Sequence, residues 1–94
     1  MASSAPTIIG HGAERMRLIC FATLDPKDRK VVQGASLAGA GPREEAGLAI
    51  VEGDGGYYLF TCDREWRVMW DSWFQTIDDC KRSYEKLQLK WISA

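Results

Sequence analysis

The chain has 94 residues, with 12 basic and 13 acidic side chains and a formal net charge of −1. This length predicts a single domain with one modest core. The near balance of charges argues against nucleic acid as a partner, because proteins that bind it usually carry a clear basic excess.

The cysteine pattern excludes two further classes of protein. Cys20, Cys62 and Cys80 form an odd set without CxxC spacing, whereas a secreted disulfide framework usually has an even number and a zinc site has paired ligands. No apolar run approaches the roughly 20 residues of a membrane span, and the first residues lack the basic region of a signal peptide. We therefore expect a cytoplasmic protein with reduced thiols and no membrane partner.

The first residues of the chain are mostly small or polar and show neither helical nor strand periodicity. Residues 1–14 are expected to form a flexible tail, and residues 15–94 a single α+β domain. The first strand is predicted over residues 16–23, an apolar run with β-branched and aromatic members. Asp25 to Asp28 predicts a turn, because proline presets φ and aspartate bonds its own backbone. A short strand is predicted next, over residues 30–33.

The segment from Gly34 to Pro42 is rich in glycine and alanine, and the preceding strand can extend into it toward Leu37. A surface loop is favoured over a helix, since each glycine inside a helix costs about 1 kcal/mol relative to alanine. A bulged edge strand is the alternative. Pro42 to Glu45 is expected to form one helical turn.

A hairpin and a returning strand are predicted in the middle of the chain. Gly47 to Glu52 and Tyr57 to Cys62 form its two strands, and Gly53 to Gly56 supplies the positive φ that tight hairpin turns require. Asp63 to Glu65 then turns the chain, and a strand returns it from Trp66 to Trp70 or Asp71. Period-2 alternation puts Trp66, Val68 and Trp70 on the inner face of that strand and Arg67, Met69 and Asp71 on the other.

An amphipathic helix is predicted from Thr76 to Trp91. Thr76 is the expected N-cap, with Asp79 three positions further on. An apolar stripe follows at spacings of three and four: Ile77, Cys80, Tyr84, Leu87 and Trp91. The predicted fold class is α+β, with this helix packed on one face of a four- to five-stranded antiparallel sheet.

Catalytic, metal and cofactor motifs are absent from the sequence. The single histidine, His11, falls in the expected tail, where a base is not held in place, so Cys–His or Ser–His–Asp chemistry has little support. Phosphate-loop and metal-ligand spacings are missing too. Asp71 is expected to accept backbone N–H groups at a bend. The alternative is a small-ligand or enzymatic site formed by Asp71, Trp73 and Tyr84.

A basic row is predicted on the outer side of the helix, at Arg82, Lys86 and Lys90. A solvated helix face is the simpler interpretation. Contact with an acidic partner, or with single-stranded nucleic acid stacked on nearby aromatic rings, is the other.

Aromatic residues are concentrated in the second half of the chain, which holds all four tryptophans and all three tyrosines. One helix covers one face of a sheet, so alternation leaves some rings on the other face, where aromatic patches usually mark an interface. Packing of these rings in the core is the alternative. We predict binding of another protein or of a second copy, as in an adaptor or immunity protein. The predicted surface comprises Tyr57, Met69, Asp71, Trp73, Arg82 and Lys86, with the sheet face away from the helix in contact with the partner.

The C-terminal part of the chain carries a strand–strand–helix pattern that resembles one found in other proteins. Its residues are Gly56 to Phe60, Cys62–Asp63, Trp66, Asp71–Ser72–Trp73 and Thr76 to Lys81. This pattern resembles a group of small uncharacterised bacterial proteins with a GYYL strand and a DTWH-T-EEA entry to a helix. The group often has Trp–His where this chain has Trp73–Phe74. The resemblance implies a fold and a bacterial origin, and no activity.

Overall fold

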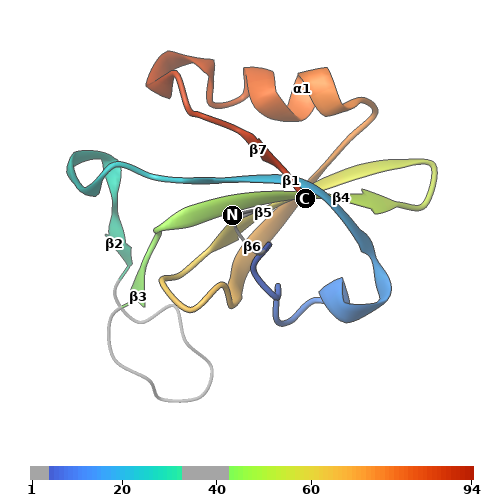
Figure 1. The fold of residues 1–94 in the computed structure, drawn as a ribbon, viewed down its shortest axis with the longest axis horizontal. Coiled ribbons are helices and arrows are strands. Elements are labelled where there is room, and N and C mark those ends of the chain that lie inside the picture. Colours follow the sequence, from blue (N-terminus) through green and yellow to red (C-terminus); the bar gives the residue numbers. More distant parts are fainter. Residues whose placement is uncertain (1–4, 33–42) are drawn as a thin grey trace.

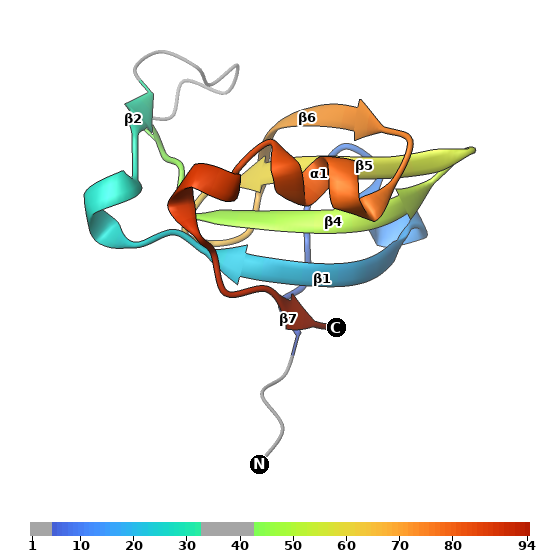
Figure 2. The ribbon, with the colours of Figure 1, turned by 90° about the horizontal axis from the view of Figure 1, so that it is seen from above.

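The computed structural model describes residues 5–32 and 43–94 of the chain. Five strands in these residues form one antiparallel sheet: β1 (Arg17–Thr23), β4 (Gly47–Gly53), β5 (Gly56–Cys62), β6 (Val68–Phe74) and β7 (Ile92–Ser93). Their order across the sheet is β6-β5-β4-β1-β7. Figure 2 shows β6 and β7 at its two opposite edges. The predicted antiparallel sheet is confirmed.

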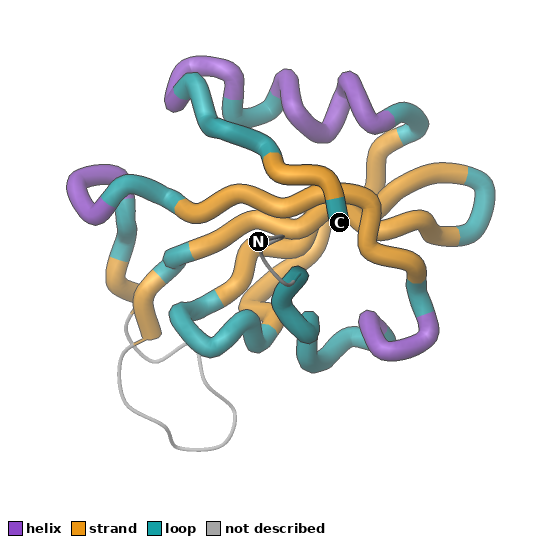
Figure 3. The backbone as a smooth tube through the Cα atoms, in the orientation of Figure 1, coloured by secondary structure: helices purple, strands orange, loops and turns teal. Residues whose placement is uncertain are grey.

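Both faces of the sheet are covered (Figure 1). On one face lies the helix α1 (Ile77–Arg82), followed by a 3-10 turn at Glu85–Leu87. On the other face lies the N-terminal segment, residues 8–16, with a 3-10 turn at Ala13–Arg15. Figure 3 marks these helical segments in purple on the two sides of the sheet. The predicted α+β class, with a C-terminal helix on one sheet face, is confirmed.

The central strand β4 contributes to the core on both faces. Leu48 and Ile50 pack on the side of α1, whereas Ala49 and Val51 pack on the side of the N-terminal segment. All four are fully buried. A continuous apolar run is typical of a strand that is covered on both faces. None of the helices within residues 5–32 and 43–94 is long and apolar enough to cross a membrane.

The predicted hairpin between β4 and β5 is confirmed. Gly53 pairs with Gly56 across a two-residue turn, and Gly55 has a φ of 69°, which glycine adopts without a steric cost. The turn after β1 is confirmed too, because the side chain of Asp25 caps a 3-10 turn at Pro26–Asp28.

A two-stranded ribbon lies beside the main sheet. It pairs β2 (Val31–Val32) with β3 (Arg43–Glu44). The predicted helical turn at 42–45 is therefore wrong over its described part, since pairing with β2 holds the backbone of β3 extended. The predicted loop at 34–42, and an extension of the preceding strand toward Leu37, lie outside the described residues.

Part of the stretch expected to be a flexible tail packs on the sheet. Ile8 and Ala13 are buried in the same cluster as Phe60. The backbone N–H of Ile9 donates to the carbonyl of Trp66 at 3.0 Å. The expected tail boundary at residue 14 therefore differs from the structure, because two apolar side chains and a short backbone pairing dock residues 8–13 on the face that α1 leaves open. Residues 1–4 lie outside the described residues.

The C-terminal helix is shorter than the sequence predicts. Thr76 is the N-cap as predicted, since its hydroxyl accepts the N–H of Asp79 at 3.1 Å, but α1 stops well before Trp91. The hydroxyl of Ser83 donates to the carbonyl of Cys80 at 2.7 Å. A local bond of this kind competes with the helical hydrogen bonds and favours an end to the helix.

Candidate functional site

The turn that leads into β6 is built on the buried carboxylate of Asp63. Its Oδ1 accepts the backbone N–H groups of Glu65 and Arg67 at 3.0 and 2.9 Å. Its Oδ2 accepts the side chains of Arg43 and Arg67, each at 2.9 Å. Burial alone would raise the pKa of Asp63, but these hydrogen bonds and the Arg67 charge outweigh it and hold the pKa below its ordinary value of 3.8. The predicted turn is confirmed.

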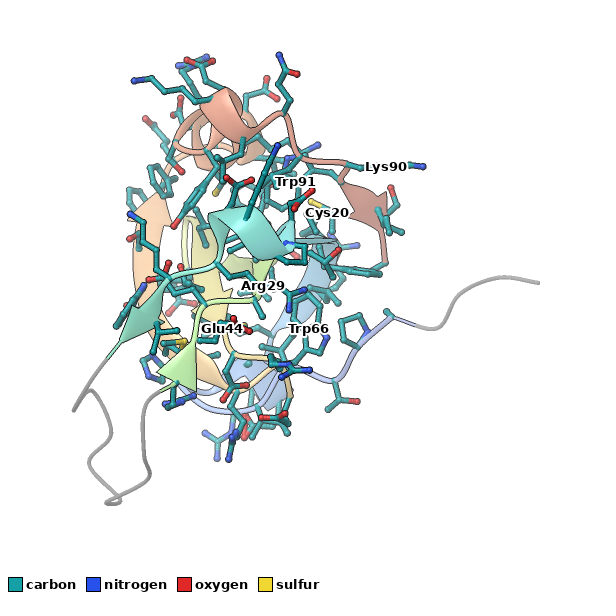
Figure 4. All side chains as sticks on the ribbon, turned by 90° about the vertical axis from the view of Figure 1, so that its left-hand side faces the viewer. Cys20, Arg29, Glu44, Trp66, Lys90 and Trp91 are labelled. Atoms are coloured by element: carbon teal, nitrogen blue, oxygen red, sulfur yellow. The ribbon has the colours of Figure 1, made fainter. Side chains whose placement is uncertain are left out.

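Trp66 closes this turn with a φ of 63°, a conformation that costs a residue with a Cβ about 1 kcal/mol or more. Its ring lies against Gly47, where an added Cβ would come within 2.6 Å of the ring. It also meets Phe21 edge to face, with 5.9 Å between the ring centroids. Figure 4 shows Trp66 and Trp91 on opposite sides of the sheet. Packing on both neighbours holds Trp66 in its strained conformation.

A β-bulge decides which face each side chain of β6 occupies. Thr61 pairs with Trp70 and Cys62 pairs with Val68, so Met69 is the extra residue. The extra residue shifts the alternation by one position. The prediction that Val68 and Trp70 share a face is therefore wrong.

Beyond the bulge, β6 alternates regularly. Phe74 packs in the helix-side core, and Asp71 contacts the N-terminal segment. Alternation therefore puts Trp70, Ser72 and Phe74 on the helix side, and Asp71 and Trp73 on the opposite side. The strand also begins and ends later than predicted, so Asp71 lies in mid-strand rather than at a bend.

The outer side of β6 is unpaired over its second half. At its start the N-terminal segment occupies this side, since the N–H of Val68 donates to the carbonyl of Ile9 at 2.8 Å. From Trp70 to Phe74, no strand within residues 5–32 and 43–94 pairs with the outer side. We call residues 70–74 the open edge. Trp70 is 36% exposed and Trp73 is 49% exposed, so each face of the open edge carries an accessible indole.

The backbone bonds of β5 show which groups of the open edge are unpaired. The carbonyl of Cys62 accepts the N–H of Ala46 at 2.8 Å, so the backbone groups of Cys62 point away from β6. Hydrogen-bonding directions alternate along an antiparallel strand, and the β5 residues that bond to β6 are therefore those opposite Ser72 and its alternate neighbours. The N–H and C=O groups of Asp71 and Trp73 consequently point outward from the sheet.

His11 and Asp71 make a contact that the sequence reasoning missed. Nδ1 of His11 lies 2.9 Å from Oδ2 of Asp71, and the imidazole meets Phe60 edge-on at 6.2 Å between centroids. The side chains are 41% and 43% exposed. A carboxylate on Nδ1 orients the ring as in a general base, but no hydroxyl or thiol of the described residues hydrogen-bonds to this imidazole.

The six residues predicted to form one interaction surface are divided between the two sides of the molecule. Tyr57, Arg82 and Lys86 lie on the helix side, Asp71 and Trp73 lie on the side of the N-terminal segment, and Met69 lies at the bulge. The surface is therefore not continuous as predicted, and Tyr57 is wrongly assigned to the face away from the helix. The alternative site is not assembled either, because Tyr84 also packs on the helix side.

Tyr84 instead lines a hollow of about 530 Å³ between the turn at Pro26–Asp28 and the end of α1. Both basic and acidic side chains line it: Lys27, Arg29, Lys30, Arg82 and Lys86, together with Asp28, Glu45 and Glu85. Arg29 is paired with Glu44 at 3.6 Å, and Figure 4 shows the two side by side. Mixed charges select no ion of either sign, so the hollow indicates no ligand class.

The three thiols are buried in two separate clusters. Cys62 lies on the side of the N-terminal segment, whereas Cys20 and Cys80 lie on the side of α1. An approach of Cys62 to Cys80 is therefore excluded. Burial raises the pKa of Cys62 to about 12, with the Asp63 charge adding to it, and raises the pKa of Cys80 to about 11, with Cys20 adding to it. Thiols of this kind are poor nucleophiles.

Comparison of the chain with protein-family models, with curated proteins and with solved structures finds no match. Within residues 5–32 and 43–94, no three His, Cys, Asp or Glu side chains gather closely enough to hold a metal ion. The open edge is therefore the best-defined candidate site.

Proposed function

We propose that the protein binds another protein chain, which adds a strand to the open edge of β6. The observation that carries this proposal is the pair of accessible indoles, Trp70 and Trp73, on opposite faces of one unpaired strand. An added strand gains backbone hydrogen bonds from the edge, and side chains on the two faces supply specificity. Tryptophan is among the residues that contribute most to binding energy at interfaces.

The other edges of the fold support the choice of β6. Native proteins usually shorten, cover or charge an edge strand, because an unpaired edge invites other chains. The opposite edge of the sheet is formed by β7, which has only two residues. The first part of β6 is covered by Ile9. Residues 70–74 are neither shortened nor covered within the described part of the chain, and their one charged side chain, Asp71, is hydrogen-bonded to His11. An adaptor or immunity-like role is the concrete form of this proposal, by analogy with other small binding domains.

A charge on the open edge tests the proposal. Trp73→Lys places a desolvation cost at the edge, and Ile92→Lys places the same charge on the exposed Ile92 of β7. A partner is first captured from cell lysate with the wild-type protein and purified. Its affinity for the wild type, Trp73→Lys and Ile92→Lys is then measured by calorimetry. We expect Trp73→Lys to weaken binding by about tenfold or more and Ile92→Lys to leave it unchanged. Equal affinities of all three proteins would overturn the proposal.

A second candidate function is a small-ligand or proton-transfer site at His11 and Asp71. It is favoured by the short contact between the two side chains, which leaves Nε2 of the imidazole directed away from the carboxylate. A thermal-shift screen of metabolites against the wild type and His11→Ala tests it. A compound that stabilises only the wild type supports the site, and a screen without such a compound counts against it.

Single-stranded nucleic acid is not favoured as a partner. Such binding combines a basic groove with aromatic stacking platforms. Arg82 and Lys86 lie on the helix side, whereas Trp73 lies on the opposite face of the sheet. Trp73, the more exposed of the two indoles on the open edge, therefore does not share a surface with this basic pair.

A further inference from the structure

We infer that the strand added to the open edge is β6 of a second copy of this chain, paired antiparallel about a two-fold axis at Ser72. This inference rests on the proposed function and names its partner. The two sheets would then join into one continuous sheet across the axis. Closed two-fold dimers are the commonest oligomers, and such an interface uses the same patch on both copies.

Symmetry restricts the registers that such a pair can adopt. A two-fold axis perpendicular to the sheet keeps each side chain on its own face, so the axis must pass through a residue paired with its own copy. Ser72 is the midpoint of the open edge. A register centred on Ser72 therefore pairs all of residues 70–74, whereas any other centre leaves part of the open edge unpaired.

The backbone of the open edge agrees with this register. The outward-pointing groups belong to Asp71 and Trp73. With the axis at Ser72, Asp71 lies opposite Trp73 of the second copy, and both residues direct their N–H and C=O groups toward it. Each such pair exchanges two hydrogen bonds. Ser72 itself becomes a non-hydrogen-bonded pair at the axis.

Charge and ring packing select the same register. Centring on Asp71 would place two carboxylates directly opposite each other, which is destabilising. Centring on Ser72 instead places Trp70 opposite Phe74 of the second copy on the helix side, an aromatic cross-strand pair. On the other side Asp71 keeps its hydrogen bond with His11. The carboxylate therefore has a partner when the second copy excludes water.

The expected dimer is weak. Stable interfaces bury about 1,200–2,000 Å² in total, and pairing of one short strand with its copy lies at or below the lower end of that range. The dimer should therefore form and dissociate with protein concentration. Sedimentation velocity of the wild type is expected to show a monomer on dilution and a dimer at high concentration, with Trp70→Lys remaining a monomer throughout.

A cysteine at the axis gives the sharpest test. In a non-hydrogen-bonded antiparallel pair the Cα atoms lie about 4.5 Å apart, within the range that a disulfide can bridge. We expect Ser72→Cys to form a covalent dimer under mild oxidation with glutathione. Asp54→Cys, at an exposed position of the turn between β4 and β5, is the matched control and should remain a monomer. The native thiols are buried in both variants.

Two outcomes would overturn the inference: Ser72→Cys crosslinks no faster than Asp54→Cys, or the wild type stays a monomer at every concentration. Neither outcome decides the proposed function. A monomer whose affinity for a different protein is lost in Trp73→Lys would retain strand addition at the open edge and exclude a second copy. A dimer that persists in Trp70→Lys and Trp73→Lys would remove both proposals.

Discussion

Nδ1 of His11 lies 2.9 Å from Oδ2 of Asp71, although 60 positions separate the two residues in the chain. The contact joins the N-terminal segment to the strand that carries the open edge. Two residues away, the backbone of Ile9 bonds to Trp66 and to Val68, the first residue of β6, on the outer side of the strand. The N-terminal segment therefore defines where the open edge begins.

Removal of the imidazole should loosen this attachment. We expect His11→Ala to speed amide exchange at Val68, whose N–H donates to Ile9. Because both side chains are partly exposed, a double-mutant cycle of His11→Ala and Asp71→Asn should give a coupling free energy of only about 0.5 kcal/mol. Additive effects in the cycle, with unchanged exchange at Val68, would show that the contact does not hold the segment.

Asp63 is expected to make stability depend on pH in the acid range. Its pKa is lower in the folded protein than the ordinary 3.8, so its contribution to stability is complete above that value and is lost as pH falls through the lower folded pKa. Asp63→Asn should lower the free energy of unfolding near neutral pH by about 3 kcal/mol, because two arginines lose their buried counter-charge. Denaturant titrations between about pH 6 and pH 2 measure both effects.

Glu65→Gln is the control for that experiment. Glu65 pairs with Arg67 at 3.0 Å, but its side chain is largely exposed, so its loss should cost less than about 0.5 kcal/mol. The acid-dependent part of stability should persist in Glu65→Gln and shrink in Asp63→Asn. Parallel pH profiles for the wild type and Asp63→Asn would contradict this assignment.

Gly47 should resist any side chain because of Trp66. A Cβ at this position would lie 2.6 Å from the indole, and overpacking of this kind typically costs about 1–3 kcal/mol. We expect Gly47→Ala to lower the midpoint of thermal unfolding. The penalty should shrink in the Trp66→Leu background, where the ring is absent. An equal penalty in both backgrounds would assign the cost to the backbone of Gly47.

The cysteines should be unreactive in the folded protein. All three are buried, and burial raises the pKa of Cys20, Cys62 and Cys80, so the nucleophilic thiolate is scarce at neutral pH. Labelling with a thiol reagent should proceed only through unfolding, at rates that rise with denaturant. Rapid labelling of any one of them in native buffer would indicate local opening of its cluster.

Local patterns predicted the elements whose partners are close in sequence. The Gly53–Gly56 turn and the Thr76 cap involve residues three positions apart, and both are confirmed. The apolar stripe from Ile77 to Trp91 also predicted burial correctly, since all its members pack on the helix-side core. The stripe did not predict where the α-helix ends, because a 3-10 turn places Tyr84 and Leu87 on the same core as a continued α-helix would.

The candidate site depends on features with no local signal. The bulge at Met69 follows the Asp63 turn, which uses Arg43 from another strand. A regular period-2 alternation, which assumes a strand without a bulge, therefore put Trp70 on the wrong face of the sheet. The apolar run at Ile8 and Ile9 is too short to indicate a fixed position for His11, and the partner of His11 lies far along the chain. Pairwise contacts over such separations cannot be inferred from spacing in one sequence.

The most direct test of strand pairing at the open edge is the exchange of two backbone amides. The N–H groups of Asp71 and Trp73 point outward and have no strand partner within the described residues of one chain. We predict that hydrogen exchange, followed by NMR, slows at these two amides as protein concentration rises, while the amides of β7 are unaffected. Fast exchange at Asp71 and Trp73 at every concentration, with or without a captured partner, would contradict pairing at this edge.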